Sequence, residues 1–252
     1  MTEGRTIRAW LWALLGLSVG LTAFSNYWKS NLRVKEIIVE GTRVVEKNEI
    51  TQISQVKNGT LLYDVDLTQV QRNVLSHLYV KEVSVERNIP SSIKISVVER
   101  HPLTLVNANE IRYLDEDGVV LPHSISNAVF DLPVLSGIPA DVSLKLGSRI
   151  EQVDVQEALA VLWLARLSSK ELYHMISEVQ IRQGDMVLYS AEWGIPILFG
   201  RGEIPNKLAR LETFWNEVVK DQGAQNLQYI DVRYTDQIVV RWKPEHQALK
   251  SL

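Results

Sequence analysis

Two segments of the sequence bring together side chains that bind metals or phosphates in other proteins. Asp115-Glu116-Asp117-Gly118 places three carboxylates in a row, and carboxylates are the ligands that Ca²⁺ prefers. An EF-hand loop, however, needs oxygen ligands at spaced positions and a closing Glu, which this stretch lacks. Gly200-Arg201-Gly202 with Lys207 resembles a phosphate loop but lacks the spacing and the Lys-Ser/Thr pair that bind phosphate and Mg²⁺. We interpret both segments as turns, and Pro205 places a helix start after the second.

The remaining residue types that serve in catalysis are dispersed along the chain. No two histidines stand four residues apart around a Glu, as metalloproteases require, and Ser136 has no base near it in sequence. The absence of cysteine excludes disulfides, thiolate nucleophiles and cysteine metal sites. We therefore predict that the protein is not an enzyme and holds no cofactor or metal. The histidines are His77, His101, His123, His174 and His246.

The bulk composition limits both the size of the domains and the class of partner. A chain of 252 residues is long enough for a membrane anchor plus two domains of roughly 70 to 130 residues each. The net charge is -3, and Lys and Arg are scattered among Asp and Glu. The sequence therefore lacks the basic stripe that is typical of proteins that bind nucleic acid. We expect neither nucleic acid nor a small-molecule substrate as a partner.

The N-terminal segment has the pattern of a membrane-spanning helix. Residues 9–28 contain no charge, would form a helix about 30 Å long, and lie between Arg8 and Lys29. Aromatic residues stand near both ends, as they do where a helix meets the two membrane interfaces. We predict a tail over residues 1–8 and a single membrane span over 9–28, which leaves the bulk of the chain on one side of the membrane; counting charges does not decide which side. A cleaved signal peptide is the alternative, because Ala23-Phe24-Ser25 has the small-x-small pattern of a cleavage site.

The first segment after the anchor alternates strand and helix patterns. Residues 32–39 predict a strand, residues 45–56 a short helix, and Asp66 with Gln69 a capped start for a second helix. The period-2 alternation before and after Asn88 to Ser92 predicts a β-hairpin. The order β-α-α-β-β over residues 32–102 describes a compact α+β domain.

The second half predicts a mixed β domain over residues 103–243, with an antiparallel sheet and two main helices, followed by a tail over 244–252. Trp163 in the first helix is expected in the core rather than in a ligand platform. The last two strands are expected to be joined by a tight Thr235-Asp236 turn. The predicted helices cover residues 151–167 and 206–219, and the predicted strands cover residues 179–181, 186–189, 195–199, 229–234 and 237–242.

The order of several short motifs resembles the POTRA domain of the FtsQ/DivIB bacterial cell-division family. Four of them lie in the first domain and two in the second, where a turn motif and an LPxLxG-like segment resemble the family's β domain. Their order and spacing directly behind a single apolar segment carry the resemblance. The motifs are Val39-x-Gly41, Leu61-Leu62-Tyr63-x-x-Asp66, Val80-Lys81-x-Val83-x-Val85-x-Arg87-x-x-Pro90, Val97-x-Glu99-Arg100-x-Pro102, Tyr113 to Pro122 and Leu132 to Gly137.

The resemblance implies a non-enzymatic divisome scaffold at the division septum, linking early and late division proteins. It also implies an anchor in the bacterial inner membrane, with a cytoplasmic tail over residues 1–8 and the bulk of the chain outside the cytoplasm. It implies that the terminal strand binds the FtsB/FtsL complex by accepting a strand from FtsB, since an edge strand recruits strands. Arg233 is expected to face a partner carboxylate, and Tyr234 and Trp242 to act as apolar anchors. The alternative for these two aromatic side chains is that they cover the end of the sheet. The implied partner-binding residues are Arg233, Tyr234, Asp236, Gln237, Ile238, Val239, Val240, Arg241 and Trp242.

Two other functions fit parts of the sequence. A POTRA chaperone module for outer-membrane insertion or secretion would share the first domain, but such proteins usually carry a β-barrel, for which this chain has no long series of alternating strands. An anchored periplasmic hydrolase would need catalytic groups that converge in a cleft from distant segments.

Overall fold

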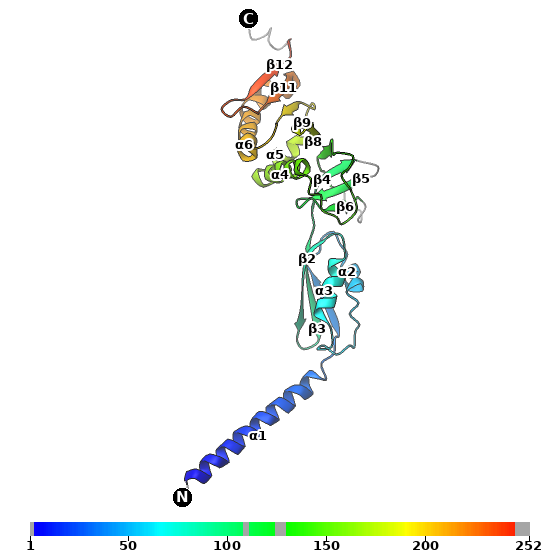
Figure 1. Cartoon of the computed structure of the whole chain (residues 1–252), viewed down its shortest axis with the longest axis vertical. Helices are drawn as coiled ribbons and strands as arrows, with labels where there is room; N and C mark the ends of the chain where they lie inside the picture. Colours follow the sequence, from blue (N-terminus) through cyan, green and yellow to red (C-terminus); the bar gives the residue numbers. More distant parts are fainter. Residues whose placement is uncertain (1–2, 108–110, 124–129, 245–252) are drawn as a thin grey trace. The chain divides into compact units, whose positions relative to one another are not determined.

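The structure is a computed structural model that describes residues 3–107, 111–123 and 130–244. The chain consists of two compact units, Met1–Glu99 and Arg100–Leu252. Each unit has its own sheet, as Figure 1 shows.

The N-terminal segment forms a single helix, α1 (Glu3–Lys29), of 27 residues, which contains the predicted helix over residues 9–28. Among the residues that the structure describes, no helix combines the length and apolar character needed to cross a membrane.

The rest of the first unit has the predicted β-α-α-β-β order. Its sheet has the strand order β1-β3-β2, in which β3 pairs antiparallel with β2 and parallel with β1. Helix α3 packs on β2 and α2 on β1, and both helices bury apolar side chains (Figure 1). The elements are β1 (Glu36–Glu40), α2 (Lys47–Ser54), α3 (Leu67–Leu75), β2 (Val80–Asn88) and β3 (Ser92–Glu99).

Local signals for the second helix and the hairpin are confirmed, whereas the first strand is shorter than predicted. Asp66 is the N-cap of α3, and its carboxylate accepts hydrogen bonds from the backbone N–H of Thr68 at 2.9 Å and of Gln69 at 3.1 Å. The predicted strand over residues 32–39 begins only at Glu36. Its first residues bond elsewhere, because the N–H of Val34 donates to the carbonyl of Thr60 at 2.9 Å.

A buried carboxylate joins the end of the hairpin to the loop before α2. Glu99 is 4% exposed and accepts hydrogen bonds from the backbone N–H groups of Arg43, Val44 and Val45 at 2.8 to 3.1 Å. Those N–H groups have a charged acceptor instead of water, so the loop is tied to the last strand of the unit.

The second unit contains one nine-stranded sheet with the order β12-β11-β10-β9-β8-β7-β4-β5-β6. The prediction of an antiparallel sheet is wrong in part, because three pairs of neighbouring strands are parallel: β10–β11, β4–β7 and β7–β8. Helical segments within residues 153–175 connect β7 to β8, and others within residues 204–226 connect β10 to β11, as crossovers between parallel strands commonly do. The connection from β4 to β7 runs instead through β5 and β6. The strands are β4 (Pro102–Asn107), β5 (Ile111–Asp115), β6 (Val120–Pro122), β7 (Val134–Ser136), β8 (Ile176–Arg182), β9 (Asp185–Ser190), β10 (Pro196–Leu198), β11 (Leu227–Asp231) and β12 (Val239–Trp242).

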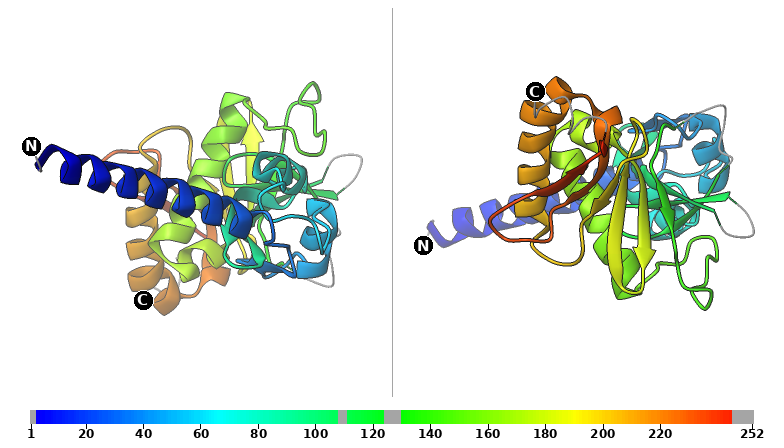
Figure 2. Two further views of the ribbon diagram at one scale, coloured as in Figure 1. Left: turned by 90° about the horizontal axis from the view of Figure 1, so that it is seen from below. Right: turned by 90° about the horizontal axis from the view of Figure 1, so that it is seen from above.

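Two main helices pack on this sheet, as predicted. Helix α4 contacts α6 and the strands β4 and β8, and Figure 2 shows α4 and α6 on the same side of the sheet. Trp163 packs partly buried against the core. The second predicted helix covers residues 206–219. In the structure the α-helix α6 ends at Phe214, and the remaining residues form a π-helical turn. The helices are α4 (Val153–Ser168), α5 (Lys170–Met175), α6 (Ile204–Phe214), the π-helical turn Trp215–Val219, α7 (Lys220–Gln222) and a 3₁₀ turn (Ala224–Asn226).

Candidate functional site

Strand β12 is the last strand of the nine-stranded sheet and pairs with β11 along one side. The register places Asp231 opposite Val239 and Ile230 opposite Val240. Among the described residues no strand is paired with the other side of β12. The prediction that the terminal strand is a sheet edge is therefore confirmed, although the strand covers Val239–Trp242 rather than residues 237–242.

The two last strands are joined by a seven-residue segment, residues 232–238, not by the predicted tight Thr235-Asp236 turn. After β11 the backbone stays bonded to β10 for one more residue and is then held by α6. The N–H of Val232 donates to the carbonyl of Leu198 at 3.1 Å. Arg210 of α6 donates to the carbonyl of Val232 at 3.4 Å and to that of Tyr234.

The hydrogen-bond pattern shows which backbone groups of β12 face the open side. The N–H of Lys243 donates to the carbonyl of Asn226 at 2.8 Å, so it points toward β11. Backbone groups alternate in direction along a strand, so those of Val239 and Arg241 also point toward β11. The N–H and C=O of Val240 then point away from β11, toward the side on which another strand would pair.

The side chains of the strand divide between the core and the opposite face. Ile238, Val240 and Trp242 are partly buried and pack against the core of the unit, while Arg241 is exposed. The bulky residues at these positions are thus part of the core packing.

Arg233 already has a carboxylate partner within the chain. Its Nε donates to Oδ1 of Asp231 at 2.9 Å and its Nη2 to Oδ2 at 2.6 Å, a two-point contact of the kind that Arg makes best. The hydrogen bond from Arg233 lowers the pKa of Asp231, and the same bond raises the pKa of Arg233. Half of the Arg233 side chain is exposed, so it lies beside the edge strand with its charge neutralised.

The other predicted contact residues lie at or beside the edge. Tyr234 is 50% exposed, and Asp236 and Gln237 are exposed in the same loop. The structure therefore brings the predicted residues together around β12 and its preceding loop. Their contact with a partner stays a prediction.

Arg210 is a residue that the sequence did not indicate. It shapes the loop before β12 through two backbone carbonyls, yet it is 24 residues from Tyr234 in sequence. No local sequence pattern predicts such a contact, because it forms only when α6 packs beside the end of β11.

The first candidate metal segment is a tight turn between β5 and β6. Asp115 is fully buried and accepts bonds from the N–H of Asp117 at 3.0 Å and of Val119 at 2.8 Å, and from Nη1 of Arg100 at 2.7 Å. Burial raises the pKa of Asp115, although the hydrogen bonds from Val119 and Arg100 act to lower it. Its oxygens hold the turn closed, and the described residues contain no cluster of three metal-ligating side chains. His246 lies outside the described residues.

The second candidate, Gly200-Arg201-Gly202, is a turn before α6, as predicted. Lys207 is 3% exposed, and its Nζ donates to the carbonyls of Phe199 at 3.0 Å and Arg201 at 2.6 Å. Burial lowers the pKa of Lys207. This lysine braces the turn from inside, where a phosphate could not reach it without displacing both carbonyls.

Comparison with known families matches both units. A model described as POTRA domain, FtsQ-type, matches residues 32–100, and one described as FtsQ/DivIB, C-terminal related, matches residues 101–240, more than half of the chain.

Relatives that are named for cell division align over most of the sequence. Cell division protein FtsQ of Rhodothermus marinus is 29% identical over 233 residues, 89% of this chain and 83% of that protein. FtsQ of Geobacter sp. strain M21 is 28% identical over 211 residues, 83% of this chain and 76% of that protein. DivIB of Clostridium acetobutylicum is 28% identical over 106 residues, 42% of this chain and 43% of that protein. The two family models together cover both sheets described above, and the chain therefore belongs to the FtsQ/DivIB family of cell division proteins.

Proposed function

We propose that this protein is a non-enzymatic scaffold of the division machinery that binds FtsB, within the FtsB/FtsL complex, by adding a strand to β12. The observation that supports this best is the position of β12 at the end of the sheet, with the N–H and C=O of Val240 directed away from β11. An incoming strand would gain main-chain hydrogen bonds from these groups without displacing any strand of the fold.

The partner's side chains would meet a surface of mixed character. Tyr234 offers a half-exposed aromatic ring, and Arg241 an exposed cation on the face opposite the core. Arg233 would contribute less than an unpaired cation, since Asp231 already neutralises it. We therefore assign most of the affinity to main-chain pairing and to Tyr234 as an apolar anchor.

The test exploits the alternating direction of the backbone groups. Val240→Pro removes an N–H that points outward and leaves the pairing with β11 in place, because proline is tolerated on the open side of an edge strand. Val240→Ala is the matched control, since it changes the side chain and keeps the N–H. Binding of the full chain to the FtsB and FtsL ectodomains from the same cell is measured by pull-down and titration.

We expect Val240→Pro to weaken binding about tenfold or more and Val240→Ala to leave it within about threefold. Tyr234→Ala should also weaken binding while the thermal midpoint stays unchanged, because its ring is half exposed. Undiminished binding by a folded Val240→Pro chain would exclude strand addition. Failure of the unmodified chain to bind would exclude FtsB as the partner.

Although no described helix reaches the combined length and apolar character of a membrane span, we further propose that residues 9–28, the uncharged part of α1, anchor the chain in the inner membrane. Residues 1–8 would then lie in the cytoplasm and the units of residues 32–102 and 103–243 outside it. The support is the surface of α1, on which large apolar side chains are 48 to 72% exposed along the length of the helix. An unburied apolar surface of this extent is stable where lipid covers it. The exposed residues are Trp10, Trp12, Leu14, Leu15, Leu17, Val19, Leu21, Phe24, Tyr27 and Trp28.

A further inference from the structure

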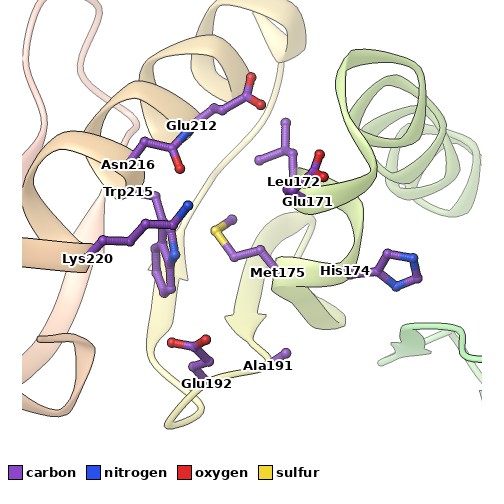
Figure 3. Close-up of a pocket in the computed structure, with 10 residues that line it drawn as sticks. All are labelled: Glu171, Leu172, His174, Met175, Ala191, Glu192, Glu212, Trp215, Asn216 and Lys220. Atoms are coloured by element: carbon purple, nitrogen blue, oxygen red, sulfur yellow. The ribbon is translucent and has the colours of Figure 1, made fainter.

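The second unit has a groove remote in sequence from β12, between α5 and the end of α6, with a volume of about 270 Å³. Figure 3 shows that α5 supplies one wall, the end of α6 and its π-helical turn the other, and the turn between β9 and β10 closes the lower end. We name it the α5–α6 groove and define it by Glu171, Leu172, Met175, Glu192, Glu212 and Trp215.

The floor of the groove is apolar and firmly held. Leu172 and Trp215 are 2% and 7% exposed, and Met175 points across the groove toward Trp215 (Figure 3). The β9–β10 turn is tied to α5 by the N–H of Ala191, which donates to the carbonyl of Met175 at 2.6 Å. Glu212 is tied to the N-cap of α5 by the hydroxyl of Ser169 at 2.6 Å. The groove is thus a preformed feature of the fold.

The charge of the lining favours a basic partner. Glu171 and Glu192 are exposed at the rim, Glu212 is partly buried, and Lys220 is the one lysine or arginine among the lining residues. Three carboxylates against one ammonium leave the groove with an excess of negative charge. Such a site attracts cations and repels acidic segments.

Trp193 is the residue after Glu192, a member of the lining, and its side chain is not packed into the core. It follows Glu192 in the β9–β10 turn, its side chain is 70% exposed, and its φ of +63° lies in the left-handed region. A bulky residue in that region is strained, whereas glycine or asparagine adopts it readily. The β9–β10 turn therefore presents an exposed indole at the residue after Glu192, and indole is the best ring for binding a guanidinium or ammonium group.

We propose that the α5–α6 groove with Trp193 is a second protein-binding surface, which takes a basic segment that inserts an apolar side chain between Met175 and Trp215 and places Lys or Arg against Glu171, Glu192 and Trp193. This surface is separate from β12 and does not depend on strand addition. A partner that binds here leaves the edge strand open for another.

The probe is a short peptide in which lysine and arginine flank one benzophenone-bearing residue, which serves as the apolar anchor and reacts on illumination with nearby C–H bonds, those of methionine above all. The full chain is illuminated with this peptide and the labelled residue is identified by mass spectrometry. We expect labelling at Met175. A peptide of the same length with glutamate in place of the basic residues should label this site at least about tenfold less.

Two variants separate binding from folding. Glu171→Lys with Glu192→Lys should lower the labelling of Met175 about tenfold, whereas Asp141→Lys with Glu151→Lys, which changes the same charge at exposed positions outside the lining, should not. Trp193→Gly removes the ring and relieves the left-handed backbone, so labelling should fall severalfold while the thermal midpoint stays the same or rises.

Labelling that is spread over the surface, or equal with the acidic peptide, would overturn the proposal. So would a fall in thermal midpoint for Trp193→Gly, because the ring would then have a structural role. Sedimentation of the chain alone is the last check: a dimer that Trp193→Gly dissociates would assign the groove to a second copy of this chain instead.

Discussion

At the residue scale, short-range ion pairs and hydrogen bonds set the ends of the elements that carry the candidate site. Asp231, the last residue of β11, is 4% exposed and receives three hydrogen bonds from Arg233, two from its side chain and one from its backbone N–H at 3.0 Å. These contacts turn the chain out of the sheet immediately after β11. The position of the loop before β12 therefore depends on one ionised carboxylate.

The pH dependence of stability should report on this carboxylate. The pKa of Asp231 in the folded state lies below its ordinary value of 3.8, which is the value in the unfolded state. The stability that this carboxylate contributes is therefore present in full above 3.8 and is lost as the pH falls from there through the pKa of the folded state. We expect the unmodified chain to lose more stability between about pH 5 and pH 2 than Asp231→Asn. Urea unfolding across this range measures the difference.

The control for this comparison is Asp141→Asn, which removes an exposed carboxylate from the same unit. Its pH profile should follow that of the unmodified chain. A profile of Asp231→Asn that also follows the unmodified chain would contradict the role assigned to the Asp231–Arg233 pair.

At the scale of elements, the centre of the nine-stranded sheet depends on a close approach of two backbones. Gly137 follows β7, which lies between β4 and β8, and has a φ of +72°. A Cβ at this position would lie 2.0 Å from the carbonyl oxygen of Ile181 in β8. Backbone cannot move aside as a flexible side chain can, so any side chain here must separate two paired strands.

Gly137→Ala should therefore destabilise the second unit by about 3 kcal/mol or more. Gly202→Ala is the matched control, because Gly202 has a similar φ of +64° but nothing within 4 Å of its would-be Cβ. The control should lose only about 1 kcal/mol, the cost of the left-handed backbone. Urea unfolding of both variants separates steric overlap from backbone strain, and equal losses would disprove the close approach.

At the scale of the whole molecule, the exposed apolar surface of α1 contrasts with the buried cores of the two sheets. We expect the chain to sediment with membranes after an alkaline wash. Leu17→Lys with Leu21→Lys should release much of it, since each lysine near the centre of a span costs about 2.5–3.5 kcal/mol. Leu167→Lys, at an exposed position of α4, should leave the distribution unchanged. A chain that stays in the soluble fraction would contradict the anchor.

The order of elements in the first unit could be predicted because its signals are local. The cap at Asp66 bonds to residues two and three positions away, and the hairpin strands pair across a loop of a few residues. The turn at Asp115 closes on the N–H groups of Asp117 and Val119 in the same way. Such contacts depend on spacing along the chain, which periodicity and residue type express directly.

The mixed strand order of the second unit, the long loop before β12 and the α5–α6 groove were decided by tertiary structure. Each depends on contacts between segments far apart in sequence, such as Arg210 with Tyr234 and Ser169 with Glu212. The sequence by itself determined that a terminal strand exists. Its motifs also determined the family to which the chain belongs. Only the packed sheet decided that Val240 directs its backbone outward while its side chain enters the core, because both directions follow from the strand's pairing with β11.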